Sequence, residues 1–267
     1  MARLLVFDSG LGGLSVASAI QTIMPDAVIT YAADTGWFPY GTRTPDVLLP
    51  RLTRFIRDLI THEKPCATII ACNTASTLAL PILREAFPDM PFIGTVPALK
   101  QAALRSTSKV IGLVATPATV KSSYLDTLEQ TVASECTVIR RPSRKLASIA
   151  EDWLRGLPIN TQVISEEIAP LFSHSALDTI VLGCTHYSFL REELKKLAPR
   201  PVLWLDSGTA IARHTCDIIG STPMSGQNRC LVSEHKHGYD QIFARYNFPT
   251  PVLWDTSSVE NLQRAPS

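Results

Sequence analysis

ATIIACNTAS (67–76) and DTIVLGCTHYS (178–188) are the two segments of this sequence that decide the fold. In each, a short apolar run rich in β-branched residues leads to a small residue, a cysteine and then polar residues. This is the pattern of a buried strand that turns into a helix. The match predicts two similar strand–loop–helix units that carry Cys72 and Cys184 at the carboxyl ends of their strands. Open α/β sheets bind ligands at that edge.

Strand-like and helix-like stretches alternate on both sides of these segments, which predicts parallel sheets covered by helices. TPATV (116–120) is predicted to be a loop. The predicted strands are 3–7, 28–33, 67–71, 91–95, 110–115, 136–141, 179–183 and 202–206, with short strands at 231–233 and 252–254. The predicted helices are 14–24, 46–62, 74–86, 120–131, 145–154, 160–173, 187–197 and one that begins at 208.

The repeated thiol-bearing unit predicts an α/β fold with two pseudo-symmetric lobes. Each lobe is expected to hold a mostly parallel sheet flanked by helices. We assign residues 1–96 plus 208–267 to the N-terminal lobe and residues 97–207 to the second lobe. A cleft between two lobes is a common place for a ligand, so the active site is expected there.

Composition and charge exclude several classes of protein. The 267 residues carry 25 basic and 24 acidic side chains, so net charge offers no argument for a nucleic acid or an anionic membrane as partner. No apolar run approaches the roughly 18–20 residues that span a bilayer. The first apolar stretch is too short for a signal peptide. We therefore expect a cytoplasmic protein.

The six cysteines show neither a CxxC pair nor the Cys/His spacing of a zinc site, so no metal is expected. The ordinary fate of a free cysteine is to be a small buried hydrophobe. That interpretation holds for the cysteines at 66, 136, 216 and 230, whereas Cys72 and Cys184 stand out by their matched contexts. His235 and His237 fit a solvated loop better than a metal site.

Polar residues follow several of the predicted strands. Asp8 and Ser9 lie in FDSGLGG (7–13), which fits either a capped turn or a site for a carboxylate. Its glycines do not match the GxGxxG spacing of dinucleotide sites, so a nicotinamide cofactor is not favoured. CNT (72–74) combines a thiol, an amide and a hydroxyl at a helix N-terminus, a place that favours a thiolate and offers donors to an anion. CTH (184–186) adds His186 as a proton partner.

Taken together, these motifs resemble the glutamate racemase family. The matching strings occur in the family's order over about residues 4–212. They are FDSGLGGLSV (7–16), PYG (39–41), ACNTAS (71–76), GTVPA (94–98), GLVATPATVKSSY (112–124), VLGCTHYSFL (181–190) and DSG (206–208).

The resemblance implies a cofactor-independent isomerase, usually a homodimer, that interconverts L- and D-glutamate and supplies D-glutamate for peptidoglycan. It implies that Cys72 and Cys184 are the two acid/base thiols, assisted by Asp8 and His186. A family glutamate near the second thiol is carried onto Glu151, although Ser143-Arg144 stands where the family usually has Cys-Pro. The implied substrate contacts are Asp8, Ser9, Tyr40, Gly41, Asn73, Thr74, Thr116, Thr119, Thr185 and His186.

Three alternatives stand beside this interpretation. Aspartate racemases share the two-cysteine scheme but usually have glutamate after the second Cys-Thr, so His186 favours glutamate as substrate. A thiol hydrolase or transferase would need only one Cys–His pair and would leave the second thiol unexplained. A binding protein on the same scaffold would have no need for both thiols, Asp8 and His186. Because the chain starts shortly before its first motif, activation by a cell-wall precursor through an N-terminal extension is not expected.

Overall fold

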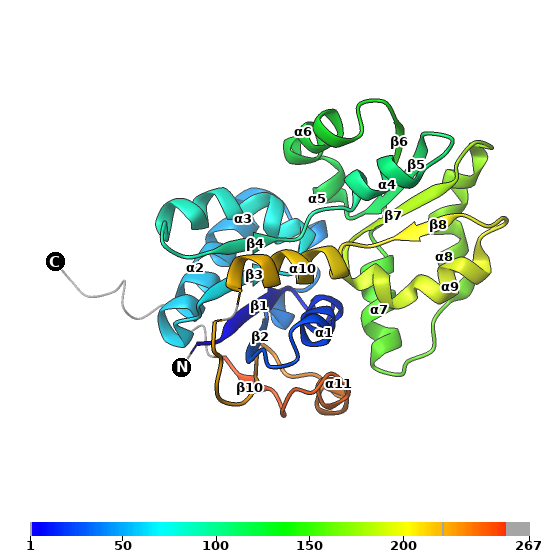
Figure 1. Cartoon of the computed structure of the whole chain (residues 1–267). Helices are drawn as coiled ribbons and strands as arrows, with labels where there is room; N and C mark the ends of the chain where they lie inside the picture. Colours follow the sequence, from blue (N-terminus) through cyan, green and yellow to red (C-terminus); the bar gives the residue numbers. More distant parts are fainter. Residues whose placement is uncertain (1, 221, 255–267) are drawn as a thin grey trace.

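The computed structural model describes residues 2–220 and 222–254, which form two parallel sheets covered by helices (Figure 1). The first sheet has the strand order β10-β9-β2-β1-β3-β4, and the second has the order β6-β5-β7-β8. Every strand pairing within the two sheets is parallel. The α/β architecture predicted from the alternating pattern is confirmed.

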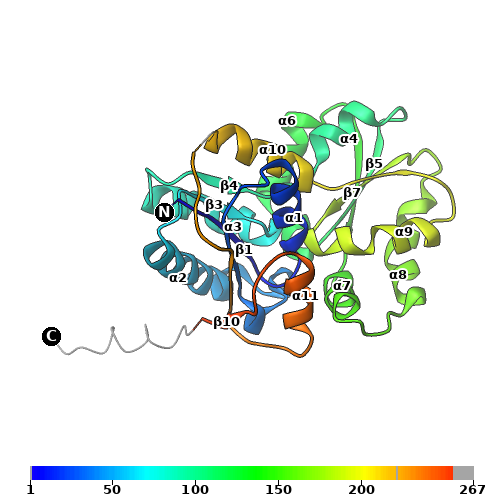
Figure 2. The ribbon, with the colours of Figure 1, turned by 60° about the horizontal axis from the view of Figure 1, so that its bottom comes forward.

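The last strands of the described chain return to the first sheet after the second sheet is complete, and Figure 2 shows this return path. Residues 255–267, which we assigned to the first lobe, lie outside the described residues. The first sheet contains β1 (Leu4–Asp8), β2 (Ile29–Ala33), β3 (Ala67–Ile70), β4 (Phe92–Gly94), β9 (Arg229–Val232) and β10 (Val252–Leu253). The second contains β5 (Val110–Ala115), β6 (Thr137–Pro142), β7 (Thr179–Gly183) and β8 (Leu203–Leu205).

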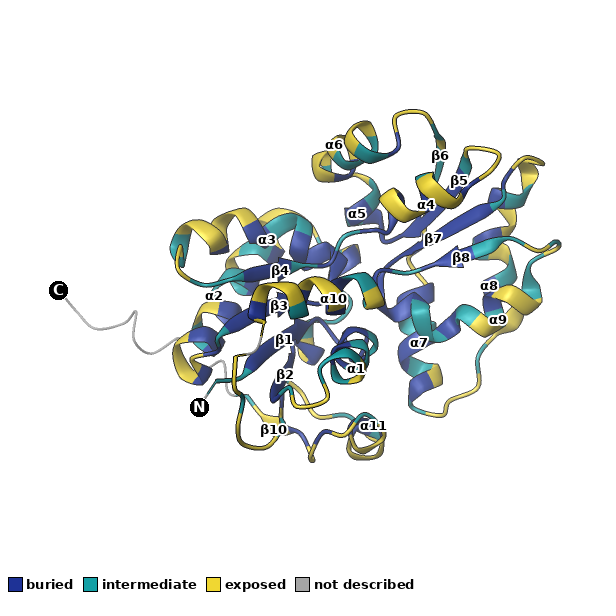
Figure 3. Ribbon diagram, in the orientation of Figure 1, coloured by how far each residue is buried: buried dark blue, intermediate teal, exposed yellow. Residues whose placement is uncertain are grey.

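Helices cover both faces of each sheet because the strands are apolar on both sides. Leu4 and Val6 of β1 pack toward α1 (Leu14–Ile23), α10 (Gly208–Ile219) and α11 (Tyr239–Arg245). Leu5 and Phe7 pack toward α2 (Pro45–Glu63) and α3 (Asn73–Ala86) on the other face. The central strands are accordingly buried, whereas the edge strands β6 and β10 and the outer helix faces are partly or fully exposed (Figure 3).

The second sheet repeats this arrangement. Val114 of β5 packs toward α7 (Leu146–Leu154), α8 (Thr161–Ile168) and α9 (Arg191–Leu197). Leu113 packs toward α4 (Leu99–Arg105) and α6 (Ser123–Val132). Among the described residues, no helix combines the length and the apolar character that crossing a bilayer would require.

Three predicted elements were wrong in part. TPATV is not a loop: Pro117–Val120 form α5, because Pro117 opens the helix and the Thr116 side chain accepts a hydrogen bond from the Thr119 N–H. The helix expected at 160–173 ends at Ile168 and continues as the 3₁₀ turn η3 (Ala169–Ser173), where Pro170 has no N–H to donate. The helix expected at 187–197 starts as the 3₁₀ turn η4 (Thr185–Leu190) before α9.

Two helices, α4 and α11, were not predicted. Each has 7 residues, about two turns, which is too short to show a clear helical period in the sequence. Tyr239 at the start of α11 is fully buried, so packing against the first sheet supports this helix more than its own propensity does.

The parallel order of the strands brings the polar residues that follow them to one edge of each sheet. Asp8 ends β1 and Cys72 follows β3 in the first sheet. Cys184 follows β7 in the second sheet. The two edges meet, because the Thr185 hydroxyl donates to Asp8 Oδ2 across a distance of 3.0 Å.

The carboxylate of Asp178, which directly precedes β7, stabilises the turn between α4 and β5. Asp178 accepts hydrogen bonds from the hydroxyls of Ser106 and Thr179 at 2.7 and 2.8 Å, and from the N–H groups of Thr107 and Ser108 at 2.8 Å each. Burial opposes the charge of this carboxylate, but the hydrogen bonds outweigh burial and hold the pKa of Asp178 below its ordinary value.

This depressed pKa predicts a loss of stability in acid. The contribution of Asp178 is complete above the pKa of the unfolded chain, about 3.9, and disappears as the pH falls through the lower folded-state pKa. Asp178→Asn is expected to lower the free energy of unfolding by about 1–2 kcal/mol at pH 7, and the difference from the parent should shrink as the pH falls below about 4. Denaturant unfolding across this pH range measures it. Asp26→Asn, at an exposed position after α1, is the control, and an equal, pH-independent loss in both variants would contradict the assignment.

Candidate active site

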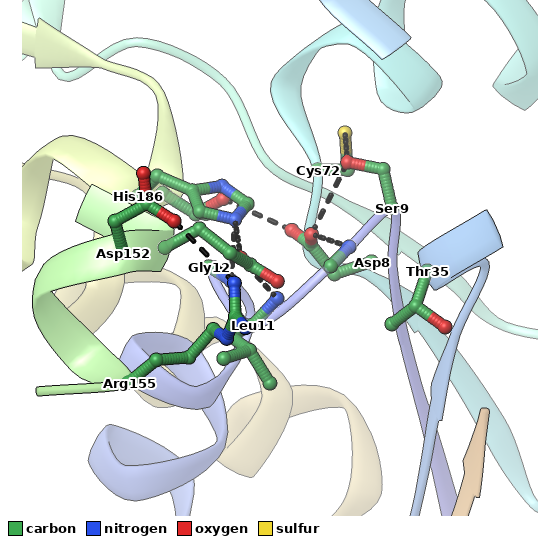
Figure 4. Close-up of polar contacts among 12 residues, drawn as sticks. Asp8, Ser9, Leu11, Gly12, Thr35, Cys72, Asp152, Arg155 and His186 are labelled. Carbon is green, nitrogen blue, oxygen red and sulfur yellow. Dashed lines mark hydrogen bonds and ion pairs between the residues drawn. The ribbon is translucent and has the colours of Figure 1, made fainter. Parts of the chain in front are cut away.

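Asp8 lies at the centre of the meeting edges and is fully buried. Its Oδ1 accepts hydrogen bonds from the Gly10 N–H at 2.7 Å and the Ser9 hydroxyl at 3.4 Å, and its Oδ2 accepts one from Thr185. Burial raises the pKa of Asp8, and the positive charge of His186 together with the hydrogen bonds from Gly10 and Thr185 opposes that rise. Figure 4 shows this carboxylate between the two halves of the site.

Cys72 precedes the first turn of α3, and its thiol faces the Asp8 loop. Its Sγ lies 3.9 Å from Ser9 Oγ, so thiol, hydroxyl and the Asp8 carboxylate form one polar chain (Figure 4). The expected effect of the helix N-terminus, which favours a thiolate, is present but is outweighed by burial. Burial raises the pKa of Cys72 well above its ordinary value and the charge of Asp8 adds to the rise, while a hydrogen bond from the Ala75 N–H only partly offsets it.

A second polar chain begins at Cys184. The Cys184 thiol interacts with His186 and contributes to the raised pKa of its ring, and His186 Nε2 lies 2.8 Å from Glu151 Oε2. Burial by itself would lower the pKa of His186, but the hydrogen bonds to Cys184 and Glu151 and the charges of Asp8 and Glu151 raise it well above the usual value. The Gly12 N–H also lies 3.1 Å from Nε2. The Gly12 N–H can donate to Nε2 only when this nitrogen carries no proton, whereas the protonated ring that the raised pKa favours donates from Nε2 to Glu151.

Glu151 reaches this chain from α7, and Ser143 explains how the helix starts without the Cys-Pro of the family. Ser143 Oγ accepts hydrogen bonds from the N–H groups of Lys145 and Leu146 at 3.3 and 3.1 Å, so it caps the first turn of α7. The Leu11 N–H donates to Glu151 Oε2 at 3.1 Å. Helix α7, which begins at Leu146, thus brings Glu151 against the loop that follows β1.

Three threonine hydroxyls connect the two sheets on the other side of the site. Thr74 Oγ1 lies 3.0 Å from Thr116 Oγ1, which lies 3.1 Å from Thr119 Oγ1. The 3₁₀ turn η2 (Tyr40–Thr42) packs on this row so closely that a Cβ at Gly41 would lie 2.3 Å from the Thr116 Cβ. Only glycine fits at that distance.

Tyr40 was expected to contact substrate. Its hydroxyl forms a hydrogen bond with an acidic residue that was not predicted from the sequence to belong to the site. The hydroxyl donates to Asp34 Oδ2 at 2.7 Å. Asp34 also accepts two hydrogen bonds of 2.7 Å from Arg51 and one of 2.6 Å from Ser233. Asp34 directly follows β2, the strand beside β1. Asp8 was predicted as a site residue because it lies at the carboxyl edge of its strand, and the same position could have identified Asp34.

Asn73 has the most informative side chain for ligand binding. It is 3% exposed, and in the part of the chain that the structure describes neither its Oδ1 nor its Nδ2 has a hydrogen-bond partner. A buried amide without partners is costly. Because an amide offers both a donor and an acceptor, Asn73 suits a ligand that carries an ammonium and a carboxylate group.

Two further contacts with the second chain of polar groups were not foreseen. The Tyr239 hydroxyl donates to Glu151 Oε1 at 3.0 Å. The Phe38 ring lies against His186, with 4.9 Å between ring centroids. Phe38 stands beside the PYG motif, whereas nothing in the sequence around Tyr239 indicates a role.

Comparison with known proteins agrees with this geometry. Residues 15–215 match the family model described as Asp/Glu/Hydantoin racemase. The chain is 44% identical over 219 residues to a glutamate racemase of Brucella anthropi, covering 81% of this chain and 79% of that protein. It is 42% identical to one of Agrobacterium fabrum, covering 88% and 85%. The structure of Escherichia coli glutamate racemase in complex with L-glutamate and the activator UDP-MurNAc-ala superposes with a TM-score of 0.87 at 34% identity, covering 95% of this chain and 98% of that one.

Proposed function

Because the chain belongs to the Asp/Glu/hydantoin racemase family, we propose that it is a glutamate racemase in which Cys72 and Cys184 are the two acid/base groups. The observation that carries this proposal is the pair of thiols at meeting sheet edges, each with its own polar chain. Cys72 connects through Ser9 to Asp8, and Cys184 connects through His186 to Glu151.

The two chains suit a two-base proton transfer. One thiolate removes the α-proton of glutamate, and the other thiol delivers a proton to the opposite face of the same carbon. Inversion needs an acid and a base at fixed positions on both faces. In the direction in which Cys72 delivers the proton, its raised pKa favours the required thiol form, and Cys184, with His186 as its proton partner, is the base. The roles exchange in the reverse direction.

The remaining residues would hold the substrate. Asn73 offers its unpaired amide, and the row Thr74, Thr116 and Thr119 offers hydroxyls to a carboxylate. Ser9, Tyr40, Gly41 and Thr185 complete the proposed contacts. Cys72 is 7% and Cys184 8% exposed, so both thiols lie in surroundings with little access to solvent.

The cellular role follows from the reaction. We place the protein in the supply of D-glutamate for peptidoglycan synthesis in the cytoplasm, and we propose that it works as a homodimer. Light scattering coupled to size-exclusion chromatography tests the assembly, and a monomer at working concentration would refute it.

A racemisation assay tests the proposed activity. Purified protein freed of metal by chelation is incubated with L-glutamate, without added cofactor, and the two enantiomers are separated by chiral chromatography. We expect D-glutamate to accumulate to an equal share. Racemisation of L-aspartate in place of L-glutamate would move the assignment to aspartate, and covalent trapping of Cys72 alone without racemisation would favour a thiol hydrolase or transferase.

Asn73→Ala is expected to raise the KM for glutamate by about 10- to 100-fold, the effect of losing hydrogen bonds to charged groups. Thermal stability should stay equal or rise, because the variant removes a buried amide that has no partner in the described structure. Steady-state kinetics and thermal melting measure both. Asn160→Ala, which removes the cap of α8, should do the reverse: stability falls and KM is retained. A large loss of stability in Asn73→Ala with unchanged KM would show a structural role.

A further inference from the structure

The segment that follows β9 forms hydrogen bonds both with the first sheet and with the end of α7. Near its start, the Ser233 hydroxyl donates to Asp34. Farther along, the Arg155 guanidinium at the end of α7 donates through Nε to the His237 carbonyl oxygen at 3.2 Å. Helix α11 then begins at Tyr239 and lies beside α7 (Figure 2). The end of the described chain therefore reaches the helix that carries Glu151.

We propose that Tyr239 is a positioning residue for the Cys184 half of the reaction: its hydroxyl holds the Glu151 carboxylate in the orientation that directs His186 toward Cys184. This inference rests on the proposed racemase function. It adds to that function a role for a chain segment in which no sequence motif was found.

The contacts of Glu151 carry the inference. Its two oxygens have different partners: Oε1 accepts from Tyr239, while Oε2 accepts from the Leu11 N–H and faces His186 Nε2. Glu151 is 4% exposed, so each donor replaces hydration that the buried carboxylate has lost. Among the described residues, the Tyr239 hydroxyl is the hydrogen-bond donor to Oε1, and without it only the contacts of Oε2 limit rotation of the carboxylate about its last side-chain bond.

Tyr239 is itself held in place. It is fully buried, and its ring packs edge-on against Phe243, with 5.9 Å between the centroids. Burial and the charge of Glu151 keep the pKa of the Tyr239 hydroxyl far above the working pH, so the group stays a donor throughout turnover. A buried aromatic ring that offers one hydroxyl to a buried carboxylate is a rigid support.

Tyr239→Phe tests the proposal with little change in packing. We expect kcat for glutamate to fall about tenfold, the size of effect of one hydrogen bond to a charged group, while KM changes less than about twofold. Weakening only the Cys184 half makes its proton transfer more rate-limiting. The α-deuterium isotope effect should therefore increase for the enantiomer that Cys184 deprotonates and decrease for the enantiomer that Cys72 deprotonates.

Tyr246→Phe is the matched control, because Tyr246 follows the same helix and packs edge-on against Phe189. It should keep the parental kcat and isotope effects. In a Glu151→Gln background, Tyr239→Phe should cost less than about twofold, since both changes act through one carboxylate. A full tenfold further loss in that background, or isotope effects that rise equally for both enantiomers, would overturn the proposal.

A measurement without turnover separates this proposal from the racemase assignment. The ring-nitrogen NMR resonances of His186 should shift in Tyr239→Phe and stay in place in Tyr246→Phe, whether or not the protein racemises glutamate. Unshifted resonances in Tyr239→Phe would refute the positioning role. A parent protein that racemises no glutamate but shows the shift would refute only the proposed function.

Discussion

Serine in place of Cys72 or Cys184 is expected to lower the rate of glutamate racemisation by at least about a thousandfold. General acid–base catalysis by a positioned side chain contributes roughly 10²–10⁴ in rate, and a hydroxyl is far too weak an acid and base to replace a thiol. Neither thiol can replace the other, because Cys72 and Cys184 follow strands of different sheets and connect to different polar chains.

Each single variant should retain a partial reaction that the double variant lacks. The remaining thiol can still remove the α-proton of the enantiomer that it faces and return a solvent proton to the same face. Exchange without inversion is therefore expected for one enantiomer in Cys72→Ser and for the other in Cys184→Ser. Chiral chromatography with mass spectrometry measures both. Cys66→Ser, whose hydroxyl can keep the contact to the Arg3 carbonyl oxygen, is the control. A Cys184→Ser protein that racemises at the parental rate would refute the two-base mechanism.

Alanine at Gly12 is expected to lower kcat by about a hundredfold while the protein still folds. A Cβ at this position would lie 2.2 Å from His186 Nδ1 and 2.7 Å from Thr185 Oγ1. Both side chains are buried, so His186 has to move away from Glu151 and Cys184 to make room. A displacement of about 1 Å at a catalytic group costs on the order of 10²-fold in rate.

The same substitution should cost only about 1–3 kcal/mol in the free energy of unfolding, the usual effect of overpacking. Kinetics and denaturant unfolding separate the two effects. Gly208→Ala is the control, because its Cβ would meet nothing closer than Asp206 Oδ1 at 3.5 Å, an ordinary contact. Full activity in Gly12→Ala would show that the position of His186 does not limit the reaction.

The sheets and the centre of the site could be predicted because both depend on local patterns. Apolar, β-branched runs mark β3 and β7, and a polar residue directly after a strand lies at the carboxyl edge. The same pattern covers Asp8, Cys72, Thr116 and Cys184. It also covered Asp34, which was overlooked because its neighbours suggested only a turn.

The rest depends on distant parts of the chain. The α7–α11 contact that joins Tyr239 to Glu151 spans 88 positions, and neither residue has a local signal for it. The pKa of Cys72 was expected to fall because a helix N-terminus is visible in the sequence. It rises because burial, which only the packed structure reveals, is the larger effect. A local feature predicts the direction of a pKa shift only where packing does not impose a stronger shift of the opposite sign.

Incubation with L-glutamate in deuterated water tests the two-thiol mechanism most directly. The protein is used without added cofactor, and both enantiomers are isolated early in the reaction. We expect the D-glutamate formed to carry deuterium at the α-carbon while the remaining L-glutamate is nearly free of it, because the proton is removed by one group and delivered by another. Equal deuterium in both enantiomers from the earliest times would indicate a single base and refute the two-thiol mechanism.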